Sequence, residues 1–145
     1  MTGMLPGEGW HLIADLIDGA HLDDADRIER ILSDAAAAAG ATLLEVRLHK
    51  FGAGFGVTGV ALLAESHISI HTWPEYGTAC VDIFMCGRTN DLDAALAVIV
   101  AGLEALVGQQ AIHRRAFGSE GTRRRVDDGS KAQCSLNFPP RVDRR

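Results

Sequence analysis

The sequence predicts an α/β fold, a two-layer α/β sandwich with a mostly antiparallel sheet and its helices on one face. Three observations predict it. Six segments alternate apolar and polar residues or carry a short apolar run, as strands do, and only two have the spacing of amphipathic helices. The strand segments in the middle of the chain follow one another closely enough for hairpins, which favours antiparallel pairing. The expected order is β-α-β-β-β-β-α-β.

The first half of this order begins with residues 10–16, which alternate as a strand does. A helix is expected from an aspartate cap at position 23 or 24 to about residue 39, because acidic residues crowd its first turn and Gly40 follows it. Residues 42–50 alternate again, which indicates the second strand.

The second half contains four more strands and one helix. Strands are expected over 57–64, 66–72, 78–85 and 110–117, and the helix over 91–106. The apolar, β-branched run at 57–64 predicts a strand that is buried on both faces. From Ser119 onward no periodicity remains, so we expect a single domain over residues 1–118 and a disordered tail over 119–145.

Composition and charge exclude several classes of function. The chain has 145 residues and a net charge of −5, so it lacks the basic surface that binds nucleic acid. Its most apolar run, residues 94–107, is interrupted by a glycine and a glutamate and falls short of the roughly 20 residues that span a membrane. The start has no signal-peptide pattern, and the three cysteines have no disulfide-like spacing. A cytoplasmic protein without a membrane partner is expected.

The most informative segment is residues 64–77, which reads Ala-Glu-Ser-His-Ile-Ser-Ile-His-Thr-Trp-Pro-Glu-Tyr-Gly. It crowds polar side chains into a strand-like run, although buried polar atoms need partners. The segment resembles, nearly position for position, the self-cleavage segment of the pyruvoyl-dependent S-adenosylmethionine decarboxylases of bacteria and archaea. The resemblance covers residues 9–117 and is strongest over 57–87.

The resemblance implies that the chain is a zymogen that cleaves itself between Glu65 and Ser66. In this chemistry the serine hydroxyl attacks the carbonyl of the preceding residue, the resulting ester is lost by β-elimination, and hydrolysis leaves a pyruvoyl group and ammonia. A planar peptide bond resists such attack unless it is strained or polarised, and a tight turn at Glu65-Ser66 can store the strain. Ser66 would become the covalent pyruvoyl cofactor, which forms a Schiff base with the substrate amine and accepts the electrons left when carbon dioxide departs.

Three further residues match the processing and reaction positions of this family. His71 corresponds to the histidine that acts as base in processing, and imidazole suits that task near neutral pH. Strict alternation along a strand places residues 66 and 71 on opposite faces, so this role requires Ser66 to lie at a turn, off the regular strand. Thr58 matches a hydroxyl residue that supports processing. Cys86, in Asp-Ile-Phe-Met-Cys-Gly, matches the proton donor of the decarboxylation.

The resemblance also implies the substrate, S-adenosylmethionine, and a place in spermidine and polyamine biosynthesis. Phe51 and Trp73 match the aromatic residues that sandwich the adenine, and their faces also favour the sulfonium cation. Glu75 is placed to accept hydrogen bonds from the ribose hydroxyls. The cleaved chains, 1–65 and 66–145, are expected to stay together and to form a homo-oligomer, at least a dimer, with active sites between protomers.

One departure from the family leaves alternatives open. The glycine-rich run 51–56 replaces a proline-containing turn beside the implied adenine site. A pyruvoyl enzyme that decarboxylates ornithine or arginine is therefore a second hypothesis. A third is a non-catalytic metal-binding or regulatory module that uses His49, His67, His71 and Cys86, although these lack the paired spacing of zinc sites. A fourth is an uncleaved, inactive paralogue that pairs with an active partner. The leading hypothesis requires no metal.

Overall fold

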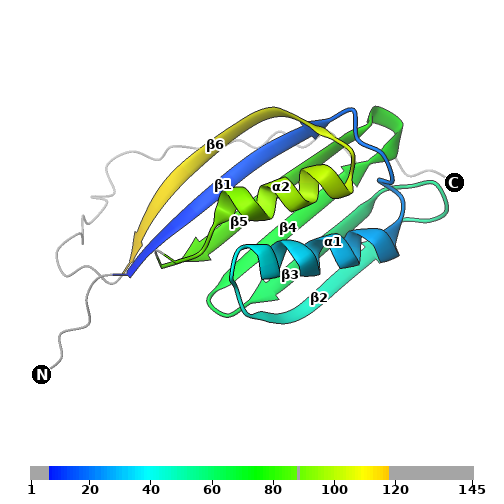
Figure 1. Ribbon diagram of the computed structural model, residues 1–145. Coiled ribbons are helices and arrows are strands. Elements are labelled where there is room, and N and C mark those ends of the chain that lie inside the picture. Colours follow the sequence, from blue (N-terminus) through cyan, green and yellow to red (C-terminus); the bar gives the residue numbers. More distant parts are fainter. Residues whose placement is uncertain (1–6, 88, 118–145) are drawn as a thin grey trace, which may run out of the picture.

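The computed structural model describes residues 7–87 and 89–117, and this part of the chain contains six strands and two α-helices (Figure 1). The strands are β1 (Gly7–Ile17), β2 (Leu43–Lys50), β3 (Val57–Leu63), β4 (Ser66–Trp73), β5 (Thr78–Cys86) and β6 (Leu106–Phe117). The helices are α1 (Ala25–Ala38) and α2 (Leu92–Gly102), with a short 3-10 helix, η1 (Pro74–Tyr76), between β4 and β5. The predicted order of strands and helices is confirmed.

The strands form one antiparallel sheet in the order β2-β3-β4-β5-β1-β6. Both helices lie side by side on one face of this sheet (Figure 1). Among the described residues no element covers the opposite face, which we call the open face. The fold is the predicted two-layer α/β sandwich, and β4 and β5 lie in its middle.

The core lies between the helices and the covered face of the sheet. Every second strand residue points into it, and the buried ones include Leu12, Leu16, Ile68, Ile70, Ile83 and Met85. Helix α1 contributes Ile28 and Leu32, which are completely buried. The helix begins at a predicted cap, because the side chain of Asp24 accepts a hydrogen bond from the backbone N–H of Arg27 at 3.0 Å.

Three details differ from the prediction. Helix α2 ends at Gly102 instead of residue 106, and β6 begins at Leu106 instead of residue 110. A Cβ at Gly102 would lie 2.6 Å from the side chain of Ile31, so the two helices approach closely there, and Glu104 then leaves the helix with φ of 50°. The prediction that β3 is buried on both faces is wrong, since Leu62 on the open face is 43% exposed. The reason is that both helices cover the same face.

Two other expectations concern membranes and the end of the chain. In the described residues, no helix combines the length and the apolar character needed to cross a membrane. The end of the predicted domain at residue 118 and the predicted tail over 119–145 lie outside the described residues.

Candidate active site

The predicted site residues fall into two groups at opposite ends of β4. One group, the cleavage end, comprises Glu65, Ser66 and Cys86. The other, the aromatic end, comprises Phe51, Thr58, His71, Trp73 and Glu75. Residues 66 and 73 are the first and last of β4, and at about 3.3 Å per residue they lie roughly 23 Å apart.

At the cleavage end, Cys86 contacts both partners of the bond that is predicted to break. Ser66 is buried and pairs with Leu63 across a tight hairpin, and its Oγ accepts a hydrogen bond from the backbone N–H of Cys86 at 3.0 Å. The thiol of Cys86 donates a hydrogen bond to the carbonyl oxygen of Glu65 at 2.9 Å. A donor on this oxygen polarises the carbonyl that a serine hydroxyl would attack.

The position of Cys86 is fixed by its surroundings. Cys86 ends β5 opposite Gly9 of β1, and the side-chain amide of Asn90 donates to its carbonyl oxygen at 2.9 Å. Gly87 follows with φ of 83°, a left-handed conformation that glycine adopts readily, and its N–H bonds to the carbonyl of Glu8 at 2.9 Å. The chain therefore turns away directly after the cysteine, which leaves the thiol beside Glu65.

The backbone of Glu65 is strained. Its φ is 60°, in the left-handed region, which costs a residue with a side chain roughly 1–2 kcal/mol. The strain arises because only Ala64 and Glu65 connect the paired ends of β3 and β4. The sequence predicted a tight turn at this place, and the structure has one directly before Ser66.

At the aromatic end, a hydroxyl and an imidazole form a pair on the open face. Thr58 of β3 and His71 of β4 are cross-strand partners, and Thr58 Oγ1 lies 3.0 Å from His71 Nδ1. The ring of Trp73 lies next along β4, with its centroid 6.3 Å from that of His71. Phe51 is 61% exposed and Trp73 is 38% exposed, so both rings offer surface to a ligand. Glu75, in η1, is exposed beyond them.

The glycine-rich run 51–56 has a physical reason to lack proline. Gly52 and Gly54 have φ of 122° and 75°, which proline cannot adopt. Gly56 lies against the backbone of β4, where a Cβ would approach the carbonyl oxygen of Thr72 to 1.9 Å. The turn therefore brings the chain close to the end of β4, and Phe51 closes it by donating its N–H to the carbonyl of Gly56 at 3.1 Å.

Ser66 and His71 do not meet within one chain. Ser66 points to the helix-covered face, whereas His71 is exposed on the open face. Five residues separate them along β4, or roughly 17 Å at about 3.3 Å per residue. Ser66 does lie at a turn, as expected, but it is still a paired residue of β4. A turn at Ser66 is therefore not enough to bring the two side chains together.

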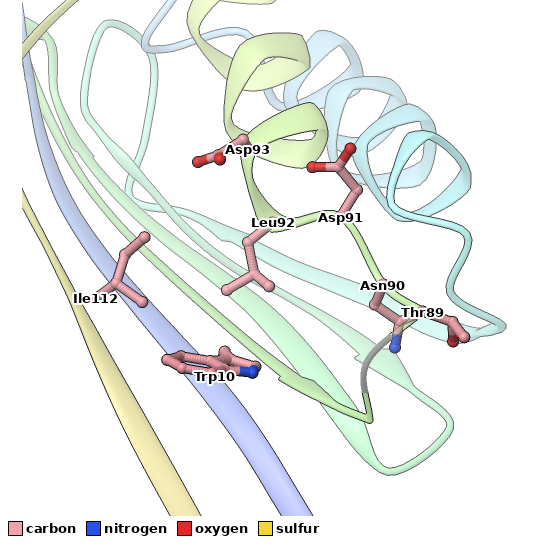
Figure 2. A pocket seen from close by; sticks show the side chains of 7 residues that line it. All are labelled: Trp10, Thr89, Asn90, Asp91, Leu92, Asp93 and Ile112. Atoms are coloured by element: carbon pink, nitrogen blue, oxygen red, sulfur yellow. The ribbon is translucent and has the colours of Figure 1, made fainter.

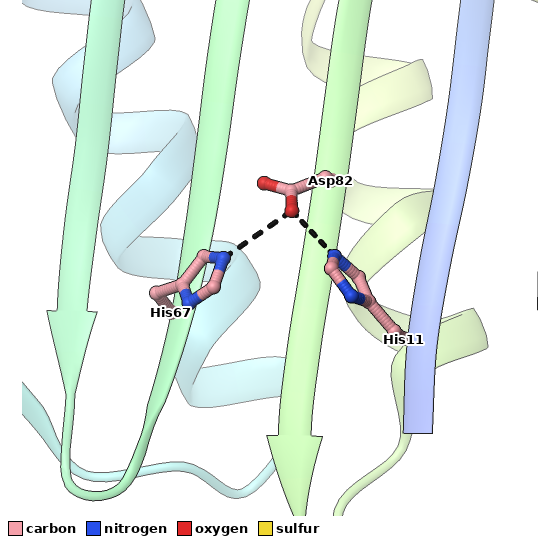
Figure 3. A group of neighbouring side chains, drawn as sticks. All are labelled: His11, His67 and Asp82. Carbon is pink, nitrogen blue, oxygen red and sulfur yellow. Dashed lines mark hydrogen bonds and ion pairs between the residues drawn. The ribbon is translucent and has the colours of Figure 1, made fainter. Parts of the chain in front are cut away.

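Between the two ends, the open face carries a cluster that the sequence did not reveal. Asp82 of β5 lies in hydrogen-bond distance of His11 of β1 and His67 of β4 (Figure 3), and also of Ser69 of β4. Its Oδ2 is 2.5 Å from His11 Nε2 and 3.2 Å from His67 Nε2. Partial burial alone would raise the pKa of Asp82, but the hydrogen bonds from Ser69, His11 and His67 and the attraction of His67 lower this pKa below its usual value. The carboxylate therefore stays charged.

A second cysteine, Cys80, lies beside His71 but is kept as a thiol. The two residues are cross-strand partners of β5 and β4. Burial raises the pKa of Cys80, and a hydrogen bond with Asp15 and the charge of Asp15 raise it further. Because the thiolate is the reactive form, this environment makes Cys80 a poor nucleophile.

The residues of the metal-binding hypothesis do not gather. In the part of the chain that the structure describes, three potential ligand atoms lie within 4.8 Å of one another at His11, His67 and Asp82. His49 lies on β2 next to Phe51, and Cys86 lies at the cleavage end. Of the four residues named by the hypothesis, only His67 belongs to this group.

A hollow of about 510 Å³ lies on the helix-covered side, at the start of α2 (Figure 2). Its walls include Trp10, Ile112 and Leu92, with Asp91 and Asp93 at its acidic edge. It contains no predicted site residue, and the side chain of Asp91 already caps α2 by accepting the N–H of Ala94 at 2.9 Å. The predicted chemistry therefore lies elsewhere, at the two ends of β4.

Sequence reasoning missed several polar groups around the predicted site. No catalytic or binding role was predicted for His11, and Asp82 appeared only as part of the motif that carries Cys86. No site role was predicted for Ser69, Asn90 or Arg115 either, although the structure bonds them to Asp82, Cys86 and His11 respectively. A usable signal was present for Asp82, because an acidic residue in the middle of a core strand requires donors on neighbouring strands.

Comparison with known proteins identifies the family of this chain. The sequence profile described as S-adenosylmethionine decarboxylase matches residues 10–116. A protein of Methanococcus aeolicus called S-adenosylmethionine decarboxylase proenzyme is 54% identical over 93 residues, which cover 62% of this chain and 79% of the relative. A relative of the same name from Thermodesulfovibrio yellowstonii is 44% identical over 101 residues, which cover 68% of this chain and 74% of that protein.

A solved structure agrees as well. The crystal structure of the adenosylmethionine decarboxylase of Aquifex aeolicus superposes with a TM-score of 0.66 at 32% identity and covers 81% of this chain and 97% of that one. The profile match spans most of the chain, and it includes both ends of β4. The chain belongs to the S-adenosylmethionine decarboxylase family.

Proposed function

We propose that this chain is a proenzyme that breaks its own backbone between Glu65 and Ser66 and then decarboxylates S-adenosylmethionine. The observation that carries the proposal is the double contact of Cys86, whose N–H bonds to Ser66 Oγ at 3.0 Å and whose thiol bonds to Glu65 O at 2.9 Å. The residues at the cleavage end therefore fit a serine that is converted into a pyruvoyl group. The reaction makes the enzyme a carboxy-lyase whose product supplies aminopropyl groups for spermidine.

The cleavage balances with the atoms that are present. Ser66 Oγ attacks the carbonyl carbon of Glu65, which forms an ester and turns the peptide nitrogen into an amine. A base removes the proton from the Cα of Ser66, and the Cβ–Oγ bond breaks, so that Glu65 leaves as a carboxylate that keeps the former hydroxyl oxygen. One water then replaces the nitrogen, which departs as ammonia. The thiol of Cys86 stabilises the negative charge on the carbonyl oxygen in the first step.

We expect a second copy of the chain because the proposed base, His71, lies too far from Ser66 within one chain. His71 is held by Thr58 on the open face and lies roughly 17 Å along β4 from Ser66. If two open faces pack around a two-fold axis, the cleavage end of each chain lies over the aromatic end of the other. The Ser66 side chain points to the helix-covered face, but the base acts on the proton of its Cα, which lies within the sheet at the turn and can be reached from the open face. Such a dimer completes two sites, each with Ser66 and Cys86 from one protomer and His71 from its partner. It also covers apolar side chains that are now exposed on this face, such as Ile13 and Leu62.

The same packing places the substrate. The exposed rings of Phe51 and Trp73 at the aromatic end would hold the adenine and attract the sulfonium, and Glu75 would bind ribose hydroxyls. When formed, the pyruvoyl group supplies an electron-withdrawing carbonyl for decarboxylation. Cys86 is then positioned to return a proton to the substrate carbon. The family match favours this substrate over ornithine and arginine, and it favours an enzyme over a metal-binding module.

The experiment is a measurement of the intact masses of the purified protein. We expect two fragments, residues 1–65 and 66–145, with the second beginning in a blocked pyruvoyl terminus. The Ser66→Ala chain should stay whole. Carbon dioxide release with S-adenosylmethionine, ornithine and arginine then identifies the substrate. A wild-type chain that remains uncleaved under native conditions would overturn the proposal.

A further inference from the structure

The Asp82 cluster (Asp82, His11, His67 and Ser69) connects three neighbouring strands across the open face. Asp82 is on β5, His11 is on β1, and His67 and Ser69 are on β4, which begins at the cleavage site (Figure 3). Its carboxylate accepts hydrogen bonds from the imidazoles at 2.5 Å and 3.2 Å and from the Ser69 hydroxyl. These contacts hold two side chains of β4 against β5.

Arg115 determines which ring nitrogen of His11 carries the proton. Its guanidinium nitrogen lies 3.3 Å from His11 Nδ1, and a guanidinium can only donate. Nδ1 is therefore the acceptor, and Nε2 carries the proton that is donated to Asp82. A metal bound through Nε2 would require the opposite tautomer, with an Nδ1–H facing a cation, whereas a metal-bound histidine usually gives that proton to an acceptor. The cluster is consequently a set of hydrogen bonds that meet at one carboxylate.

Cleavage removes two of the attachments that hold Ser66 in place, and its strand pairing with Leu63 remains. The peptide bond to Glu65 breaks, and the Oγ that accepts the N–H of Cys86 at 3.0 Å leaves with Glu65 as a carboxylate oxygen. Residue 66 becomes a chain end, and chain ends fray unless something holds them. In the part of the chain that the structure describes, the first side-chain hydrogen bond after this new end is that of His67 to Asp82, followed by that of Ser69 to Asp82.

We propose that Asp82 and His67 are positioning residues that hold the newly formed end of β4 in the sheet after self-cleavage, so that the group derived from Ser66 stays beside Cys86. His11 supports them by filling the second site on the same carboxylate oxygen. This proposal rests on the self-cleavage proposed above. It gives the cluster, beside its contribution to the stability of the fold, the task of holding residue 66 in the cleaved enzyme, because before cleavage the hairpin itself fixes Ser66.

The variants that test it change one hydrogen bond each. Asp82→Asn keeps the shape but replaces one of the two acceptor oxygens by a donor. His67→Leu removes the donor, and His67→Gln restores a donor at a similar reach from the backbone. The control is Glu104→Gln, which breaks another carboxylate–imidazole pair, 2.5 Å from His21, away from the site. His67 is 39% exposed in its side chain, so its replacement leaves the core unchanged.

Three measurements separate the outcomes. Intact mass should show complete cleavage of the Asp82→Asn, His67→Leu, His67→Gln and Glu104→Gln chains, all of which keep Ser66. Turnover of the cleaved enzyme should fall at least about tenfold in Asp82→Asn and His67→Leu, but stay within about threefold of wild type in His67→Gln and Glu104→Gln. Hydrogen exchange at the amides of residues 67–71 should accelerate about tenfold more in the cleaved Asp82→Asn and His67→Leu enzymes than the same changes accelerate it in the uncleaved Ser66→Ala chain.

Three results would overturn the proposal. Equal acceleration of exchange in the cleaved and uncleaved chains would make the cluster an ordinary part of the fold. Unchanged turnover and exchange in His67→Leu would remove its role. Failure of His67→Leu to cleave, while its Ser66→Ala counterpart folds normally, would place the cluster before the cleavage step. A wild-type chain that does not cleave would instead contradict the proposed function, so the two failures are distinguishable.

Discussion

The thiol of Cys86 donates a hydrogen bond to the carbonyl oxygen of Glu65 at 2.9 Å, and the backbone N–H of the same residue bonds to Ser66 Oγ at 3.0 Å. In the uncleaved chain, before any substrate binds, Cys86 therefore already contacts both residues of the bond that is proposed to break. The resemblance to the family assigned Cys86 only to the later proton transfer. The geometry allows it to serve both reactions, first through hydrogen bonding and then through its acidity.

Two substitutions distinguish the two proposed roles of Cys86, hydrogen bonding during cleavage and proton donation during decarboxylation. Cys86→Ser keeps a donor toward Glu65 but supplies a much weaker acid, so we expect cleavage within about threefold of wild type and a loss of about 10²–10⁴-fold in decarboxylation. Cys86→Ala removes both functions, so cleavage should slow by about tenfold as well. The rate of fragment formation and the release of carbon dioxide measure the two steps. Cys80→Ser is the control, and equal cleavage rates for Cys86→Ser and Cys86→Ala would refute the first use.

The strained turn predicts a second effect. Glu65→Gly removes the roughly 1–2 kcal/mol that the left-handed backbone costs a residue with a side chain. If cleavage releases this strain, the precursor becomes more stable and fragment formation slows by up to about thirtyfold. Asp18→Gly is a matched control, because Asp18 has a similar φ of 52° and lies outside the site. Unchanged cleavage in Glu65→Gly would show that the strain is not used.

Much of this architecture could be predicted from the sequence, because the local signals agree with the fold. Alternation and one apolar run predicted the six strands. Cap residues predicted where the helices begin, at position 23 or 24 and at position 90 or 91, and the structure has Asp24 and Asp91 there. The tight turn before Ser66 followed from the short gap between two strand segments. The family resemblance then supplied roles for residues that composition alone leaves open, such as Cys86.

The remaining features depend on neighbours that are distant in sequence. Asp82 meets His11 across 71 positions, and strand order, which the sequence did not provide, decides that contact. Gly102, the last residue of α2, lies against Ile31 of the other helix, a contact that the sequence does not reveal. Alternation along β4 already placed Ser66 and His71 on opposite faces of the sheet. Which of the two side chains is exposed depends on the face that the helices cover, and the structure shows both helices on the face of Ser66.

Asp82 should make stability depend on acid pH. Its pKa is lowered in the folded chain, so the unfolded chain binds more protons as the pH falls past the ordinary aspartate value of about 3.9. The contribution of Asp82 to the free energy of unfolding is therefore present above this pH and is lost below it. In the uncleaved Ser66→Ala background, Asp82→Asn should lower the unfolding free energy by about 1–3 kcal/mol at neutral pH, because hydrogen bonds to a charged group are lost.

Urea unfolding of both chains between neutral and acid pH measures this effect. The unfolding free energies of the two chains should become equal at the lowest pH, where the protonated carboxyl of Asp82 resembles the amide of the variant. Glu104→Gln provides a comparison, because its pair with His21 is more exposed, and exposed ion pairs contribute about 0–1 kcal/mol. If the difference in unfolding free energy between the Asp82 chain and the Asp82→Asn chain stayed the same at acid pH, this would contradict the charged state assigned to the carboxylate.

The position of His71 predicts rescue between two inactive chains. The Ser66→Ala chain lacks the serine and the His71→Ala chain lacks the base, so each should remain whole when produced alone. In a mixed dimer, one site combines Ser66 of the His71→Ala chain with His71 of the Ser66→Ala chain. With equal amounts and random pairing, about half of the His71→Ala chains should be cleaved, and no Ser66→Ala chain should be.

The fraction of about half is measured by mass in the unpurified mixture. Different affinity tags on the two chains then allow the mixed dimer to be purified, and in it nearly every His71→Ala chain should be cleaved. The control replaces the Ser66→Ala chain by a chain that carries both substitutions, which supplies neither group and should give no fragments. Cleavage of the His71→Ala chain alone would show that another residue is the base. Mixed dimers that form but stay whole would show that His71 does not act across the interface, and the two separate ends of β4 would then need another explanation.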